Sequence, residues 1–414
     1  MAKSAYTMVL ISFVSVAALA GITGCADTST QSAEGTRGTA ESPQSAQSAP
    51  PAPPETGAAD RRITRPLHLS FVGDIMAHDV NFMHGDFAPA YARVAHILQA
   101  DDLSFGNLEF PIDPDKPYQS FPNFNVQPPY VEAVIQAGMD VFAMANNHTT
   151  DQDLSGVLAS YRTMARFEEE YGVFFSGIRQ RNSGSWLVTR IQREGVEIGF
   201  LSATAFLNAY NQATPHTYLA SYQHREQRAE LIDHIRRAAR SVDVLVVGYH
   251  AGVEYQRAPD ADKMEFYRDL IEAGALIVWG HHPHVMQPWE LVQTPDGRQG
   301  LIMPSMGNFI SGQAWLLRPD RARDDWAYTG DSVILGVTLK PGPGGVEVSS
   351  VEPHLITSAK GDLRVDLWLL EDAAASFPDP AWREFYRIRM VEMQELLGLG
   401  TMGDQSRAQP ATAR

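Results

Sequence analysis

The sequence has 414 residues, a formal net charge of −16 and a single cysteine. A chain of this length can bury a sizeable core, in one large domain or two small ones. The excess of Asp and Glu over Lys and Arg argues against a protein that binds nucleic acid through its phosphates, because that requires a basic face. One cysteine leaves no pair for an intramolecular disulfide.

The chain begins with a segment typical of protein export. Residues 1–24 combine an early lysine with an apolar stretch too short for a membrane span, and small residues precede Cys25. The tetrapeptide ITGC (Ile22–Cys25) resembles a bacterial lipobox, in which the cysteine is lipidated and becomes the first mature residue. We therefore predict a signal peptide and a lipid anchor on Cys25, which places the protein on the extracytoplasmic face of the cell membrane. A general secretory peptide with a chance cysteine is the alternative.

Low-complexity segments flank the folded part. Residues 25–62 are dominated by Ala, Ser, Gln, Pro, Thr and Gly, and the string SAPPAPPETGAAD (Ser48–Asp60) has too little apolar surface to fold. Such a segment is typical of a tether between a membrane anchor and a folded domain. We expect the folded domain over residues 63–399 and a flexible tail over residues 400–414.

Within residues 63–399, runs typical of strands alternate with amphipathic segments of helical spacing. The predicted strands are His68–Asp74, Asp101–Phe110, Asp140–His148, Val242–His250 and Ala275–His282. The predicted helices are Ala90–Ala100, Pro129–Gly138, Leu154–Gly172, His224–Arg240 and Asp262–Gly274. Two further segments, Trp186–Thr204 and Val333–Pro353, have the pattern of hairpins. This order predicts an α/β domain with mixed strand pairing, in which two sheets pack together.

Polar side chains lie at or just after the ends of the predicted strands. They are Asp74, Glu109, Asn147, His148, His250, His282 and His284. In α/β sheets, functional groups collect at the carboxyl ends of strands, where loops bring separate segments into one crevice. Two carboxylates, a carboxamide and several imidazoles suit one or two divalent transition metal ions, since calcium prefers oxygen ligands alone. The alternative for each side chain is a structural hydrogen bond.

The stretch WGHHPHVMQ (Trp279–Gln287) places three histidines within four positions. His282 and His284 flank Pro283, which favours extended backbone, and in an extended segment both side chains point to the same side. We therefore predict His282 and His284 as metal ligands. His281 faces the other way, and we expect it to support a ligand or to lie in solvent.

Six motifs, in this order along the chain, carry a family resemblance. They are GDIM (Gly73–Met76), NLEFP (Asn107–Pro111), ANNHTTD (Ala145–Asp151), HAGVEY (His250–Tyr255), GHHPHVMQ (Gly280–Gln287) and SMGNFI (Ser305–Ile310). Together they resemble the CapA family of poly-γ-glutamate capsule biosynthesis proteins over about residues 67–312. That family is similar to the calcineurin-like metallophosphoesterases, which implies a two-sheet mixed β-sandwich flanked by helices, in four αββα layers.

The resemblance also implies roles for individual residues. Asp74 and Glu109 become carboxylate ligands of one or two divalent ions (Mn, Zn or Fe), with Glu109 as the bridge between the two. Asn147, His250 and His282 hold one ion, and His284 helps to hold the other. His148 becomes the catalytic imidazole, with Asp151 orienting it. Glu254 and Tyr255 are expected to shape a substrate pocket or simply to pack, and Asn308 to hydrogen-bond a ligand-bearing loop or form a turn.

Two positions depart from the family pattern. The superfamily has histidine where this chain has Met76, so one ion lacks a ligand or takes His78 instead, and a single tightly held ion is a further alternative. The capsule family has tryptophan where this chain has Ala251, which we expect to alter a pocket wall.

These features predict a membrane-tethered, extracytoplasmic, metal-dependent hydrolase or transferase that acts on an ester or amide bond of an extracellular anionic polymer or its precursor. The resemblance implies poly-γ-glutamate as that polymer. His148 and Asp151 beside the ligands favour catalysis. The missing histidine at Met76 favours a non-catalytic protein that binds polymer or a partner in a capsule synthesis or export complex. A phosphoesterase, which shares every one of these ligands, is the third interpretation.

Overall fold

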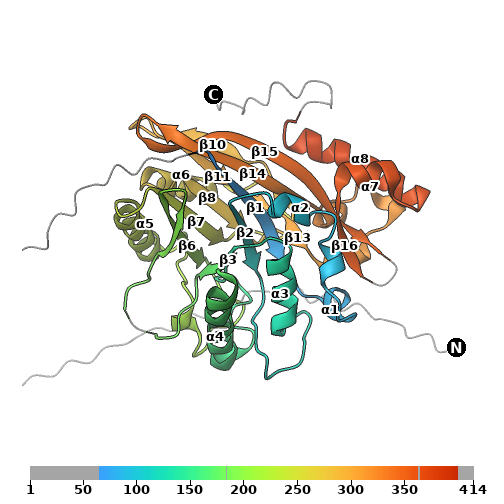
Figure 1. Ribbon diagram of the computed structural model, residues 1–414, viewed down its shortest axis with the longest axis horizontal. Helices are drawn as coiled ribbons and strands as arrows, with labels where there is room; N and C mark the ends of the chain where they lie inside the picture. Colours follow the sequence, from blue (N-terminus) through green and yellow to red (C-terminus); the bar gives the residue numbers. More distant parts are fainter. Residues whose placement is uncertain (1–64, 183, 362–363, 400–414) are drawn as a thin grey trace, which may run out of the picture. The chain divides into compact units, whose positions relative to one another are not determined.

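The long apolar runs of the sequence form the central strands of two mixed β-sheets (Figure 1). The structure is a computed structural model that describes residues 65–182, 184–361 and 364–399. The predicted signal peptide, Cys25, the tether through residue 62 and the predicted tail lie outside the described residues. Within the described ranges, no helix is both long and apolar enough to cross a membrane.

The first sheet has eight strands, seven of them in the order β16-β15-β14-β1-β2-β3-β4. Strands β1 (Leu67–Ile75), β2 (Leu103–Leu108), β3 (Val141–Ala143) and β4 (Phe174–Ser176) pair in parallel, and β13 (Asn308–Ile310) pairs in parallel with the end of β1. Strands β14 (Asp331–Gly342), β15 (Gly345–Lys360) and β16 (Val365–Leu369) extend the sheet in antiparallel fashion. The carboxyl ends of β1, β2 and β3 therefore lie at one edge.

The second sheet has six strands in the order β10-β11-β8-β7-β6-β5. Its central strands β6 (Val196–Thr204), β7 (Val244–His250), β8 (Ile277–His281) and β11 (Gln299–Met303) are parallel, and its edge strands β5 (Thr189–Arg193) and β10 (Glu290–Gln293) are antiparallel to their neighbours. Strands β9 (Met286–Gln287) and β12 (Ser305–Met306) form a separate two-stranded pair.

Aromatic side chains from both sheets meet in the core between them. The ring centroids of Phe71 in β1 and Trp279 in β8 lie 5.8 Å apart, and those of Phe105 in β2 and Phe200 in β6 lie 5.6 Å apart. All four side chains are fully buried. Trp279 also donates a hydrogen bond of 2.9 Å from Nε1 to the carbonyl of Val72. Because each buried aromatic contributes about 1.5–3 kcal/mol, this packing holds the strand ends of one sheet against those of the other.

Helices cover the outer faces of both sheets. The apolar faces of α5 (Arg225–Ala239) and α6 (Ala261–Glu272) pack on the second sheet. The first sheet is covered by α3 (Pro128–Gln136), α4 (Asp153–Tyr171), α7 (Leu370–Ser376) and α8 (Pro380–Leu396), the last two against its antiparallel part (Figure 1). The shorter helical segments are α1 (Asp79–Phe82), α2 (Ala95–Leu98), η1 (Ala88–Ala90), η2 (Thr214–His216), η3 (Gly312–Leu316), η4 (Pro319–Arg321) and η5 (Asp325–Gly330). The predicted four-layer αββα class is confirmed.

Most predicted elements are present, and both hairpins are confirmed as β5-β6 and β14-β15. Two predictions were wrong in extent. The helix predicted over Ala90–Ala100 is broken into η1, a turn and α2. The strand predicted over Asp140–His148 ends at Ala143, because the Thr149 hydroxyl accepts from the Asn146 amide and donates to the Met144 carbonyl, which closes a turn.

Candidate metal centre

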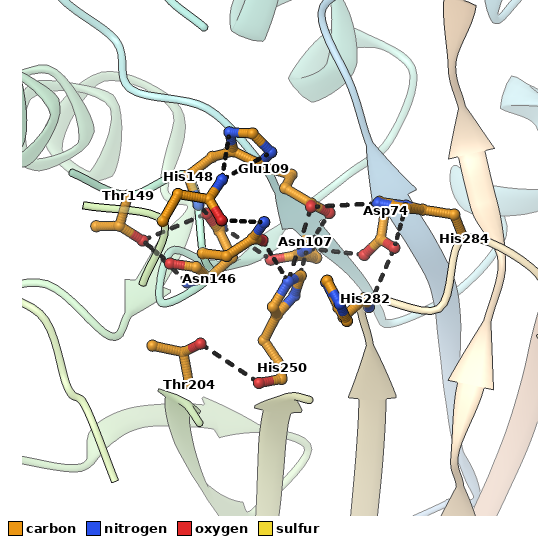
Figure 2. Close-up of polar contacts among 12 residues, drawn as sticks. Asp74, Asn107, Glu109, Asn146, His148, Thr149, Thr204, His250, His282 and His284 are labelled. Carbon is orange, nitrogen blue, oxygen red and sulfur yellow. Dashed lines mark hydrogen bonds and ion pairs between the residues drawn. The ribbon is translucent and has the colours of Figure 1, made fainter. Parts of the chain in front are cut away.

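Side chains from both sheets converge where the parallel strands end (Figure 2). They are Asp74, Asn107, Glu109, Asn146, Asn147, His250, His282 and His284, each at most 4% exposed. The first sheet supplies the carboxylates and amides, and the second sheet supplies the imidazoles. The structure thus brings together all six residues that the sequence analysis predicted as metal ligands.

A close backbone approach positions Asp74 at the end of β1. The Asp74 amide donates to the Gly307 carbonyl at 2.9 Å. A Cβ atom on the neighbouring Gly73 would lie only 1.9 Å from that same carbonyl oxygen. Only glycine fits there, since real Cβ contacts are far longer. The Gly-Asp pair of the first motif therefore lets the SMGNFI loop lie directly against the strand that carries the ligand.

Asn107 holds the two carboxylates, a role that the sequence analysis missed. Its Nδ2 donates to Asp74 Oδ1 at 2.8 Å and to Glu109 Oε2 at 3.3 Å. Asn146 donates to Asn107 Oδ1 at 3.3 Å and to the Leu108 carbonyl at 2.7 Å, which orients the Asn107 amide. The signal available in the sequence was an asparagine inside the apolar run LSFGNL (Leu103–Leu108). An amide buried in such a run needs polar partners.

Asn147 and His250 face each other across the two sheets. His250 Nε2 lies 2.7 Å from Asn147 Oδ1 and 3.7 Å from Glu109 Oε1. Asn147 donates from Nδ2 to Asn208 Oδ1 at 3.2 Å, so its amide oxygen points toward His250. His250 Nε2 therefore lies close to two oxygen donors, Asn147 Oδ1 and Glu109 Oε1.

The loop after β8 does not have the predicted extended geometry. His282 and His284 have φ angles of 99° and 57°, both in the left-handed region that residues other than glycine rarely adopt. The loop is held by Asp74, whose Oδ2 accepts from the His282 amide at 3.3 Å and lies 3.2 Å from His284 Nδ1. Asn308 Oδ1 lies 3.0 Å from the same His284 nitrogen. Tertiary contacts therefore override the extended preference next to Pro283.

His281 is buried, so the expectation of a solvent-exposed ring was wrong. Its side chain is 1% exposed, and its ring packs edge-on against Trp279 at 4.1 Å. Burial lowers its pKa to about 4, which keeps the ring neutral. It belongs to none of the metal-capable groups found among the described residues.

Three groups of side chains within the described ranges are arranged so that their donor atoms can share a metal ion. They are Glu109, His250 and His282; Asp74, Glu109 and His284; and Glu254, His282 and His284. Glu109 Oε1 is buried, lies 3.7 Å from Nε2 of both His250 and His284, and has no hydrogen-bond partner among the described residues. A buried carboxylate oxygen without a partner is costly, and a cation between these groups would satisfy it. The donor set fits one or two divalent transition metal ions.

Burial and charge set the ionisation of these groups. Burial, followed by the negative charge of Asp74, raises the pKa of Glu109 well above its usual range. Burial also lowers the pKa of His250 strongly and that of His282 to about 3, so both rings are neutral and free to bind metal. Burial alone would raise the pKa of Asp74, but the hydrogen bond and charge of His284 lower it. A divalent cation would replace this ion pair by direct coordination.

His148 stands beside these ligands with its predicted partner. Its Nδ1 lies 2.7 Å from Asp151 Oδ2, which also accepts from the Phe124 amide at 2.8 Å. The His148 ring packs edge-on against Phe124 at 4.7 Å. Asn208 Nδ2 lies 3.4 Å from both ring nitrogens, and no sequence motif pointed to this residue. Because Asp151 holds Nδ1, Nε2 is the nitrogen left to act on a substrate.

Residues 68–313 match the family model described as "Bacterial capsule synthesis protein PGA_cap", which covers more than half of the chain. The chain belongs to this family. It is similar to "Capsule biosynthesis protein CapA" of Bacillus anthracis, with 26% identity over 328 residues, 76% of this chain and 75% of that protein. It is also similar to "PGA biosynthesis protein CapA" of Bacillus subtilis (strain 168), with 27% identity over 304 residues, 71% and 73% of the two chains.

Two solved structures are more distantly similar. One is a hypothetical protein from Thermus thermophilus, with a TM-score of 0.41, 16% identity and coverage of 70% of this chain and 98% of that one. The other is the calcineurin-like phosphoesterase YfkN from Bacillus subtilis, with a TM-score of 0.36, 12% identity and coverage of 81% and 99%. At these TM-scores, neither structure adds to the fold and site described above.

The positions that depart from the family pattern lie near the metal centre but outside it. Met76 is 2% exposed and belongs to the hydrophobic core. His78, the expected substitute ligand, accepts a hydrogen bond on Nδ1 from the Gly312 amide at 3.1 Å and is in none of the metal-capable groups. Ala251 is fully buried in the core beside α6, and its effect on a pocket wall stays a prediction.

The three residues expected to serve the substrate have different surroundings. Glu254 is exposed and joins His282 and His284 in a metal-capable group. Tyr255 accepts a hydrogen bond from Gln313 Nε2 at 3.2 Å, and its ring centroid lies 6.3 Å from that of His284. Asn308 is fully buried and binds the His284 loop through both ends of its amide. Asn308 thus has the loop-holding contacts that the sequence analysis expected.

Proposed function

We propose that this protein is a metal-dependent hydrolase or transferase of capsule or poly-γ-glutamate biosynthesis. The observation that carries the proposal is Glu109 Oε1, which lies between His250 and His284 and has no hydrogen-bond partner in the part of the chain that the structure describes. The His148 and Asp151 pair lies at the same strand ends. The relatives named for capsule and PGA biosynthesis support the pathway. The bond that is broken is an ester or amide bond of an anionic polymer or its precursor.

Two sets of metal donors share the Glu109 carboxylate. Asp74, Glu109 and His284 would hold one divalent ion, and Glu109, Asn147, His250 and His282 would hold the other. Such ions supply Lewis acidity that polarises the scissile group and lowers the pKa of water. Asn107 fixes the two carboxylates, and Asn308 fixes His284.

His148 supplies the proton transfer in this proposal. The Asp151 carboxylate accepts a hydrogen bond from Nδ1, which fixes the ring orientation and leaves Nε2 to donate a proton to the leaving group. The buried wall formed by Phe124 limits the access of water to one side of the ring. A general acid placed in this way contributes about 10²- to 10⁴-fold to the rate.

A second candidate is a non-catalytic protein that binds polymer or a partner of a capsule synthesis or export complex. The observation that favours it is the buried Met76, which stands where the superfamily pattern has a histidine ligand. A phosphoesterase acting on other substrates would use the same donors. The three candidates differ in turnover and in substrate.

Turnover by the full-length chain in detergent separates these candidates. The protein is loaded with Mn²⁺, Zn²⁺ or Fe²⁺ and assayed on model phosphomonoesters, phosphodiesters and γ-glutamyl amides. We expect hydrolysis of at least one class, and we expect His148→Ala to keep its metal but lose about 10²- to 10⁴-fold in rate. Undiminished hydrolysis in His148→Ala would remove His148 from the mechanism. Full metal loading with no turnover on any class would favour the non-catalytic candidate.

We further propose that a lipid on Cys25 tethers the protein to the extracytoplasmic face of the cell membrane. The support is the lipobox-like ITGC sequence and the low-complexity segment that follows it. Membrane fractionation of cells that express Cys25→Ser tests the tether. The variant is expected in the soluble fraction, and its retention in the membrane fraction would show that another segment anchors the chain.

A further inference from the structure

One of the two donor sets is short of a ligand. Asp74, Glu109 and His284 supply three protein side chains, whereas Glu109, Asn147, His250 and His282 supply four. Met76 cannot complete the smaller set with an imidazole, and the Nδ1 atom of His78 is engaged by the Gly312 amide. A fourth protein donor for the smaller set would therefore come from another segment of the chain.

Glu254 lies on the loop after β7 and reaches this donor set. Its carboxylate oxygen and the ring nitrogens of His282 and His284 all lie within 4.8 Å of one another. Unlike the other donors, Glu254 is exposed, so it approaches the centre from the solvent side. Glu254 thus lies beside one histidine of each set, and the set that contains His284 is the one with fewer protein donors.

Two hydrogen bonds tie the segment directly after Glu254 to the segment that carries the histidines. The Tyr255 amide donates to the Pro283 carbonyl at 2.8 Å, and Tyr255 has a left-handed φ of 63°. Gln287 donates from Nε2 to the Gln256 carbonyl at 2.6 Å. A position in the left-handed region costs about 1–3 kcal/mol and persists only where surrounding contacts enforce it. The loop is thus built to hold Glu254 beside His284.

We propose that Glu254 is the fourth ligand of the metal position formed by Asp74, Glu109 and His284, in place of a histidine at Met76. This inference rests on the metal centre of the proposed function. It also assigns a role to Gln287, the last residue of the GHHPHVMQ motif, which fixes the Glu254 loop rather than touching metal. Glu254 brings a third carboxylate to Asp74 and Glu109, and like charges placed together favour a divalent cation.

The two metal positions then differ in chemistry. One offers two imidazoles, an amide oxygen and the shared carboxylate, and the other offers three carboxylates and one imidazole. Oxygen-rich sites suit Mn²⁺, whereas imidazole-rich sites also suit Zn²⁺. The position completed by Glu254 is therefore the better suited of the two to Mn²⁺.

Titration of the metal-stripped full-length chain with Mn²⁺ tests this assignment, with free Mn²⁺ followed by electron paramagnetic resonance. We expect the unmodified protein to bind two ions per chain. Glu254→Gln should retain one, with the second weakened by about 100-fold or more, since loss of an outer hydrogen-bond partner alone costs about 10- to 100-fold. His78→Ala and the matched surface control Glu272→Gln, at the end of α6, should each bind two. Thermal unfolding of each metal-free variant checks that the fold is kept.

The alternative results are distinct. Two ions bound by Glu254→Gln with unchanged affinity would overturn the assignment. Loss of the second ion in His78→Ala but not in Glu254→Gln would make His78 the ligand. A single ion in the unmodified protein would also overturn it while leaving the metal centre in place. Absence of any bound ion would instead remove the metal centre on which the proposed function rests.

Discussion

Lys263, in the first turn of α6, places a fully buried ammonium group beside the metal-ligand loops. Its Nζ donates to Gln287 Oε1 at 3.1 Å, to the Pro304 carbonyl at 3.3 Å and to the Ala251 carbonyl at 3.4 Å. These acceptors are neutral, and a cation in the first turn of a helix opposes the helix dipole. Burial lowers the pKa of Lys263 from its usual 10.5 to about 8, although Asp260 offsets part of this effect.

The lowered pKa gives the stability of the protein a defined pH dependence. The folded state releases this proton at lower pH than the unfolded state, so the contribution of Lys263 becomes more favourable as the pH rises from about 8 to 10.5. The full difference corresponds to about 3 kcal/mol, of which about 2 kcal/mol appears between about pH 7 and pH 9.5. Lys263→Met keeps most of the side-chain volume but cannot titrate. The stability of Lys263→Met relative to the unmodified protein should therefore fall by about 2 kcal/mol over that range.

Urea unfolding of the metal-free full-length chain at the two pH values measures this change. The difference between the variant and the unmodified protein cancels the titration of all other groups. Lys340→Met, on the exposed end of strand β14, is the matched control for the removal of a lysine charge. A Lys263→Met difference that is the same at both pH values would refute the reasoning, because it would show that the ammonium is not destabilised by burial.

Three further predictions follow from buried polar contacts. Asn107→Leu removes the amide that holds Asp74 and Glu109, and should weaken Mn²⁺ binding about 10- to 100-fold in the same titration. Burial raises the pKa of Asp140 to about 6, so Asp140→Asn, which still accepts from the Ser104 amide, should raise the unfolding free energy by about 1–2 kcal/mol above pH 6, and by less as the pH falls toward 4. Arg389→Met leaves the fully buried Asp331 carboxylate without its cation and should cost about 3–5 kcal/mol in urea unfolding, with part restored by Asp331→Asn.

Individual strands were predictable where an apolar run is long and ends in polar residues, whereas the order of the strands in each sheet was not predicted. Strands β1, β7 and β8 were predicted within a few residues, because their central residues are buried on both faces. The segment over residues 90–100 was mistaken for one helix. Tyr91, Val94 and Leu98 do face the core at helical spacing, but a turn that buries the same residues produces the same pattern.

The predicted ligands were accessible to sequence reasoning because each lies at or just after the end of a strand. The residues that position them were not, since their roles depend on pairing between segments. Asn208 contacts His148 and Asn147 from a loop 60 residues away from His148 in the chain. Glu254 was recognised as part of a motif, but its proximity to His284 depends on the hydrogen bonds that join two loops.

The left-handed backbone of His282 and His284 is the feature that sequence reasoning had most reason to miss. Proline restricts the residue before it toward extended geometry, so strain at His282 can exist only if the fold enforces it. The enforcing contacts are those of Asp74 with both histidines and of Tyr255 with Pro283. Contacts within the protein thus compensate a strain of about 1–3 kcal/mol at each histidine. Because the His282 amide and the Pro283 carbonyl are held by the protein itself, little of the metal affinity would be spent on ordering the loop.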